Sequence, residues 1–178
     1  MLEKHHTISV LDRYSPFLNT LELLKNMNSL GIRVRPNAAT IAVFSSDAEQ
    51  IINVEDIKIP KALSVPEGLK YIRNSILDVL REYHIERAAL RISESNAKKI
   101  NIRRIEIEGV IQEAFASSLL SSYFCGQIAT IASKLNINRA LFKQYITDEV
   151  NFDRVENWTQ HNKYEKEAIL TALGGIHA

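Results

Sequence analysis

The chain has 178 residues, of which 46% are apolar, and this composition is typical of a globular protein that buries a core. Its formal net charge is +1, so overall charge indicates neither a nucleic-acid nor a membrane partner, and such binding would need a local patch. The single cysteine, Cys125, excludes an intramolecular disulfide and favours the reducing cytoplasm as location.

Membrane association is not expected from the sequence. Its apolar runs all fall short of the roughly 18–20 residues that a membrane-spanning helix needs. The first residues, MLEKHHTISVLDRYSP, carry charges and lack the apolar core of a signal peptide.

Residues 1–29 are predicted to form an N-terminal helical extension. Ser15 is a good N-cap residue and Pro16 a good first-turn residue. The apolar positions at helical spacing are Phe17, Leu21, Leu24 and Met27. We expect the segment 16–28 to dock on the main domain or on a partner.

Residues 30–59 show the alternation of β-strands. Strands are predicted over 30–35, 38–46 and 51–59, joined by a tight turn at Arg-Pro-Asn and by a polar loop. Short connections of this kind predict an antiparallel meander.

Helices and strands alternate after residue 60. Ser64 and Glu67 have the spacing of a capping box and open a helix over 64–83, which leads into a strand over 85–95. A crossover helix before that strand favours parallel pairing. The next helix is predicted within 96–120, and its apolar face comprises Ile107, Val110, Ile111, Ala114, Phe115 and Leu119. A strand over 122–128, a broken helix over 131–146 and a closing helix over 162–176 complete the chain.

The element order is therefore βββαβαβα. This order predicts an α/β fold with a mixed five-stranded sheet and helices on both faces, within one domain over residues 30–178.

The order resembles the ribonuclease H-like fold and, within it, the RuvC-type Holliday-junction resolvases. In that family the first strand ends in apolar-Gly-Ile-Asp-Pro-Gly, and here VRPN occupies the place, with Arg35 at the position of the catalytic aspartate. The fourth strand of the family ends in a glutamate, where this chain has Ser93 followed by Glu94. The aspartate of the family's last helix corresponds to Glu167, with Glu165 two residues earlier.

The resemblance implies a degenerate active site. Such nucleases hold two Mg²⁺ ions between carboxylates, and an arginine repels a cation instead of ligating it. We therefore predict a non-catalytic or very weakly catalytic protein, a pseudonuclease without cofactor or metal, in which Arg35 pairs with Glu94 or Glu167. The alternative is an active Mg²⁺-dependent endonuclease that uses Glu94, Glu165 and Glu167 as its catalytic carboxylates.

A basic segment is a candidate for nucleic-acid binding. Lys98, Lys99, Arg103 and Arg104 lie within seven residues, and the corresponding segment of RuvC-like proteins touches the DNA backbone. The other interpretation is a solvated helix face whose cations pair with neighbouring glutamates.

Residues 130–146 also resemble a helix-turn-helix. The usual buried positions hold Ala132, Leu135, Ile137 and Phe142. Asn136 stands at the turn, where a left-handed residue is needed, and Arg139, Lys143 and Gln144 would lie on the recognition helix.

The leading hypothesis is a cytoplasmic RuvC-like protein that acts as a nucleic-acid-binding or assembly subunit. Its expected partners are DNA or RNA, and a second copy or another protein bound through residues 16–28. The alternatives are the active nuclease, a helix-turn-helix DNA-binding regulator and a protein-interaction module.

Overall fold

A computed structural model describes residues 27–94 and 100–178. Most of the predicted N-terminal extension, 1–29, lies outside the described residues. The same holds for Lys98 and Lys99 of the basic segment. The first described strand begins at Asn28, two residues before the predicted domain boundary.

A mixed five-stranded sheet forms the centre of the molecule. Its strands are β1 (Asn28–Arg35), β2 (Ala38–Ser45), β3 (Gln50–Lys58), β4 (Ile85–Arg91) and β5 (Ser122–Gly126). The order across the sheet is β3-β2-β1-β4-β5, with β1, β2 and β3 antiparallel and both β1–β4 and β4–β5 parallel. The predicted meander and the parallel fourth strand are both present.

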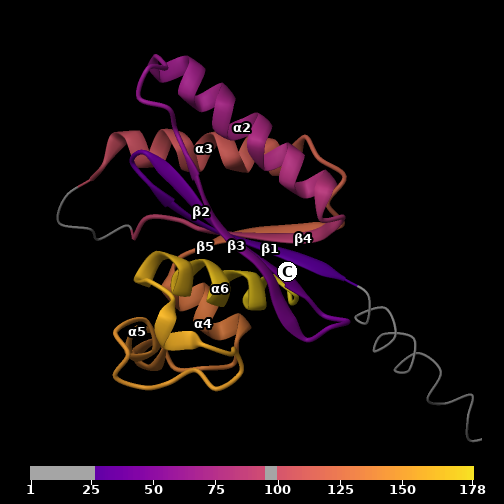
Figure 1. The fold of residues 1–178 in the computed structure, drawn as a ribbon, viewed down its shortest axis with the longest axis vertical. Helices are drawn as coiled ribbons and strands as arrows, with labels where there is room; N and C mark the ends of the chain where they lie inside the picture. Colours follow the sequence, from indigo (N-terminus) through magenta and orange to yellow (C-terminus); the bar gives the residue numbers. More distant parts are fainter. Residues whose placement is uncertain (1–26, 95–99) are drawn as a thin grey trace, which may run out of the picture.

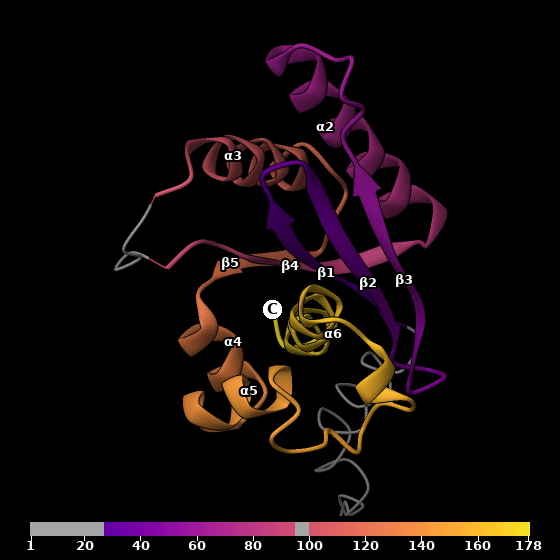
Figure 2. The ribbon, with the colours of Figure 1, turned by 60° about the vertical axis from the view of Figure 1, so that its left-hand side comes forward.

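Helices cover both faces of the sheet, as predicted. The helices are α2 (Val65–Glu82), α3 (Ile102–Ala116), α4 (Ile128–Lys134), α5 (Arg139–Ile146) and α6 (Lys163–Gly175), with a short 3₁₀ helix η2 (Trp158–Gln160). In Figure 1 and Figure 2, α2 and α3 lie on one face and α6 lies on the other, with α4 and α5 outside it. The sheet is therefore the middle of a three-layer α/β fold.

Local signals in the sequence account for the residues at which α2 and α6 begin. The predicted capping box opens α2, where the Ser64 N–H donates to the Glu67 carboxylate at 2.8 Å. A second capping box opens α6, where the backbone N–H of Asn162 donates to Glu165 at 3.0 Å. The chain itself thus provides acceptors for backbone donors at both helix starts.

Every second residue of β1 faces α6. Ser29 donates its hydroxyl hydrogen bond to the Ala172 carbonyl, and Gly31 lies directly against the backbone at Ala168 and Ala172. Side chains two apart on a strand share a face, and so do side chains three or four apart on a helix. The next positions along this line, Arg33 and Arg35, must therefore also face α6.

Leu119 is not on the apolar face of the third helix, contrary to the prediction. The helix ends at Ala116, with Ser117 as its C-cap, and Leu119 lies in the loop before β5. The residue is fully exposed, at 102% of the reference area. The helical period that placed it with Phe115 does not extend past the serines that end the helix.

Two glycine substitutions test this packing. Gly31→Ala is expected to destabilise the protein by about 3 kcal/mol or more, because its Cβ would overlap backbone atoms of Ala168 and Ala172. Gly109→Ala serves as the control: its Cβ has no neighbour within 4 Å on the exposed side of α3, so we expect a gain of about 0.5–1 kcal/mol. Chemical denaturation measures both, and a mild effect at Gly31 would contradict the close approach of α6.

Candidate functional site

The candidate site lies where β1 and β4 end beneath α6. Arg33 on β1 and Arg91 on β4 are register partners in the parallel pair, so their side chains start next to each other. Both residues are buried, with 8% and 4% exposure. Buried guanidiniums need charged or hydrogen-bonding partners, because an unpaired charge in the interior is very costly.

Glu167 on α6 supplies that partner to both arginines. Its Oε2 atom forms an ion pair with Nε of Arg33 and lies 3.4 Å from Nε of Arg91. Arg91 also pairs with Glu94, just after β4, at 3.2 Å. The two carboxylates predicted from the resemblance therefore converge, and Arg91 lies between them.

Further ion pairs surround this centre. Arg139, at the start of α5, reaches Glu94 at 3.3 Å, and Glu94 also accepts the backbone N–H of Ile128 at 3.1 Å. On α3, Glu108 pairs with Arg104 at 2.8 Å. We call these residues the arginine–glutamate cluster: Arg33, Arg91, Arg104, Arg139, Glu94, Glu108 and Glu167. It joins β1, β4, α3, α5 and α6.

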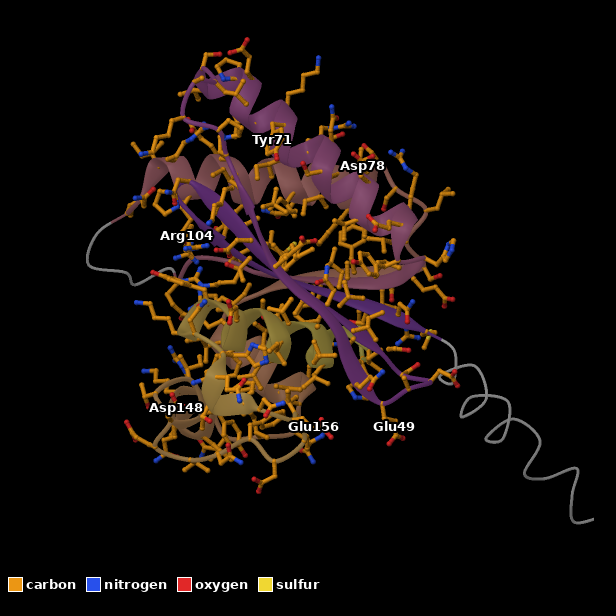
Figure 3. The ribbon with its side chains drawn as sticks, viewed as in Figure 1. Glu49, Tyr71, Asp78, Arg104, Asp148 and Glu156 are labelled. Carbon is orange, nitrogen blue, oxygen red and sulfur yellow. The ribbon has the colours of Figure 1, made fainter. Side chains whose placement is uncertain are left out.

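Ser93 connects the α3 side of the cluster to the end of β4. Its backbone N–H and its hydroxyl both donate to the Glu108 carboxylate, at 3.1 and 3.0 Å. In Figure 3, Arg104 lies at the edge of the sheet between α3 and α6. A cavity of about 360 Å³ opens here, lined partly by Ser93, Glu94, Arg104 and Glu108, so this side of the cluster faces solvent.

Burial affects the arginines at the centre most strongly. It lowers the pKa of Arg33 to about 10, although the Glu167 carboxylate opposes the shift. Burial also lowers the pKa of Arg91, with Glu167 and Glu94 opposing. A pKa near 10 leaves Arg33 protonated at neutral pH, so the centre of the cluster is a charged network.

Arg35 is not the arginine that meets Glu167, contrary to the prediction. Arg35 does end the first strand, as expected, but its guanidinium pairs with Asp56 on β3 and lies 4.7 Å from the ring centre of Tyr164. Partial burial raises the pKa of Asp56, but hydrogen bonds from Thr40 and Arg35 outweigh it and hold that pKa below its ordinary value. In the sequence, Arg33 directly follows the pair Gly31-Ile32, which is the spacing of the Gly-Ile-Asp in the family motif, whereas Arg35 follows Val34.

The other predicted site residues do not all lie in the arginine–glutamate cluster. Glu165 caps α6 and pairs with His161 at 3.3 Å, so its carboxylate is engaged at the start of that helix instead of in the cluster. Arg103 pairs with Glu106 at 3.3 Å and donates to the Val65 carbonyl at 3.4 Å. Of the two described members of the basic segment, only Arg104 reaches the cluster.

Residues 130–146 do form two short helices with a turn between them. Asn136 has the left-handed backbone that the motif needs, with φ of 55°. Ala132, Leu135 and Phe142 are buried. Of the predicted recognition residues, Arg139 is held by Glu94, while Lys143 is exposed.

Sequence reasoning missed Arg33, Arg91 and Glu108. A signal for the two arginines was present, because each interrupts an otherwise apolar run, in LGIRV and in AALRI, at a position that a buried strand fills with apolar residues. Glu108 gave no such signal, since it follows the alternating charges at the start of α3 and resembles a solvated glutamate.

The residues at these strand ends do not fit a two-metal centre. Glu94 and Glu167 are both engaged by guanidiniums, and Arg33 and Arg91 place two positive charges beside Glu167. Throughout the described parts of the chain, no group of three or more His, Cys, Asp or Glu side chains is arranged to hold a metal ion. Divalent cations prefer oxygen ligands and are repelled by fixed positive charge.

Comparison with solved structures identifies the fold. The chain is similar to the Thermus thermophilus RuvC structure in complex with a Holliday junction substrate, with a TM-score of 0.61 and 14% identity over 84% of this chain and 92% of that one. It is also similar to a second Thermus thermophilus RuvC structure, with a TM-score of 0.60 and 12% identity over 83% and 92%. No family model and no curated protein sequence matches the chain. The fold is therefore ribonuclease H-like, of the RuvC type, as the sequence predicted.

Removing the shared carboxylate tests the central ion pairs. Glu167→Gln is expected to destabilise the protein by about 3–5 kcal/mol, because two buried guanidiniums would be left without their common partner. Glu113→Gln, in the exposed pair with Arg73, is the matched control and should change stability little, since solvent screens that pair. The midpoints of denaturant unfolding compare the two, and equal effects would show that the buried pairs add nothing special.

Proposed function

We propose that this protein is a RuvC-like nucleic-acid-binding or assembly subunit that does not cleave its ligand. The observation that carries the proposal is the ion pairing of Arg33 and Arg91 with Glu167, at the ends of the strands where the resemblance expects metal-binding carboxylates. The likeness to RuvC structures supports the fold, and the charges at this position support the absence of metal-dependent chemistry.

The arginines take over the electrostatic role that bound cations would have. Carboxylates gathered at one end of a sheet repel one another unless positive charge compensates them. Here Arg33, Arg91 and Arg139 provide that charge, and they are part of the chain. A guanidinium neutralises carboxylates but cannot activate a water molecule, so this arrangement favours a structural or binding role over hydrolysis.

The side of the cluster that faces solvent is the proposed binding surface. The cavity beside Arg104 is lined by residues on both sides of the segment 95–99, which includes Lys98 and Lys99, and Arg139 is half exposed at the same end of the sheet. One RuvC structure similar to this chain is in complex with a Holliday junction, which supports a nucleic acid as the ligand. No described helix is both long and apolar enough to cross a bilayer.

The wild-type protein is expected not to cleave nucleic acid with Mg²⁺ or Mn²⁺. The purified chain is incubated with junction, flap, duplex and RNA–DNA hybrid substrates, and cleavage is read on denaturing gels. The physical reason is that Arg33 repels a divalent cation from the convergent carboxylates of the site. Metal-dependent cleavage by the wild-type protein would overturn the proposal and favour the active nuclease. Loss of that cleavage in a folded Glu94→Gln variant would then locate the activity at this site, because the Glu94 carboxylate is less buried than that of Glu167.

A variant that restores acidic ligands is the positive control for the register. The double substitution Arg33→Asp and Ser93→Glu should raise the affinity for Mg²⁺, measured by calorimetry, because it returns carboxylates to both strand ends. Arg35→Asp with Ser93→Glu is the matched variant and should bind less Mg²⁺, since Arg35 points to Asp56. Equal binding by the two variants would contradict the register based on Arg33.

Salt dependence tests the basic segment. Binding to DNA should weaken steeply as the salt concentration rises. The double variant Lys98→Ala with Lys99→Ala should reduce the magnitude of the slope of log K against log salt by about 1.8, because each phosphate that is no longer neutralised accounts for about 0.9. Arg81→Ala with Arg154→Ala is the control, because both arginines are exposed but lie outside the cluster and the basic segment. Fluorescence anisotropy at several salt concentrations gives the slopes, and an unchanged slope would remove the two lysines from the binding surface.

A further inference from the structure

An apolar groove lies at the end of β4 opposite to the arginine–glutamate cluster. It has a volume of about 570 Å³ and lies between the end of α2, the start of β4 and the loop before β5. Its apolar lining comprises Leu77, Leu80, Ile85, Leu119 and Leu120. Leu119 is completely exposed, and together with the other apolar side chains of this lining it forms an exposed apolar patch.

The N-terminal segment joins the described chain beside this groove. Asn28, the first residue of β1, is the register partner of Ile85 and donates a side-chain hydrogen bond of 2.7 Å to the Tyr83 carbonyl. Met27 is buried, and its backbone N–H donates to the Ser46 hydroxyl at 2.9 Å. The 26 residues that precede Met27 are therefore tethered next to Ile85, which is part of the groove lining.

The sequence of that segment has the chemistry the groove requires. Met27 is buried. The predicted apolar face that includes Met27 also contains Phe17, Leu21 and Leu24, and these are the side chains that the sequence offers to the groove. Leu24 lies three residues before Met27, within about 10 Å of chain, and a helix back to Phe17 spans roughly a further 10 Å. The tether is thus short enough to keep these side chains near the groove.

We propose that the N-terminal segment of the chain docks in cis in the groove at Leu119, with Phe17, Leu21 and Leu24 as the inserted side chains. The tether favours this occupant over a second copy, because linkage to Met27 gives the segment an effective concentration on the order of millimolar. Docking would cover the fully exposed Leu119 and remove the other apolar side chains of the groove from water. This inference is independent of the proposed function.

Disulfide formation in the full chain tests the proposal. In a Cys125→Ala background, Leu21→Cys is paired with Leu119→Cys, and oxidation is followed by non-reducing electrophoresis and mass. An intramolecular disulfide is expected, at a rate that does not depend on protein concentration. Asn19→Cys with Leu119→Cys is the matched control, because position 19 lies on the opposite side of the predicted helix at nearly the same chain distance from Met27. We expect its disulfide to form about tenfold more slowly.

Proteolysis gives a second readout that does not depend on disulfide geometry. Leu119→Asp should speed tryptic cleavage after Lys25 in the full chain by about tenfold, because the segment would no longer have an apolar docking surface while the exposed position leaves the fold intact. Equal closure rates for positions 21 and 19, together with unchanged cleavage, would overturn the proposal. A disulfide that forms only between chains, in proportion to concentration, would overturn it in favour of a second copy.

Discussion

The carboxylate of Glu167 sits between two buried guanidiniums, and the arrangement of the candidate site depends on it. Arg33 and Arg91 start side by side on parallel strands, where their like charges would repel each other without a shared anion. The helix that carries Glu167, α6, must therefore cross the sheet next to Arg33 and Arg91. Because Gly31 brings the backbone of α6 directly onto β1, the position of the carboxylate is fixed by close packing as well as by charge.

The cluster ties together every layer of the fold near one end of the sheet. Arg91 links β4 to α6 and to Glu94, and Arg139 links Glu94 to α5. On the other face, Arg104 and Ser93 hold Glu108 of α3 against the end of β4. Buried ion pairs contribute little net stability but make alternative packings costly, because a misplaced element would leave a charge unpaired. The network therefore favours one arrangement of these elements at the carboxyl ends of β1 and β4.

The two ends of β4 have opposite chemistry. The end at Arg91 is charged and opens to a cavity that Glu94, Arg104 and Glu108 help to line. The end at Ile85 borders an apolar groove beside the point where the N-terminal segment enters. A ligand with negative charge suits the first end, and an apolar segment suits the second. In the proposed arrangement, the protein binds its ligand at one end of the sheet and packs its own N-terminal segment at the other.

The sequence by itself determined the element order, the mixed sheet and the capping box at Ser64, whereas Glu167 was singled out only by the resemblance to RuvC-type resolvases. Period-2 and period-3.6 patterns and the turn residues are local, so they are readable without the fold. Strand alternation alone did not separate Arg33 from Arg35, because residues two apart on a strand share a face and both point toward α6. Only the crossing of α6, with Tyr164 above Arg35 and Glu167 above Arg33, decided which arginine enters the cluster. The role of Glu108 and the exposure of Leu119 were likewise decided by tertiary contacts and by the residue at which α3 ends.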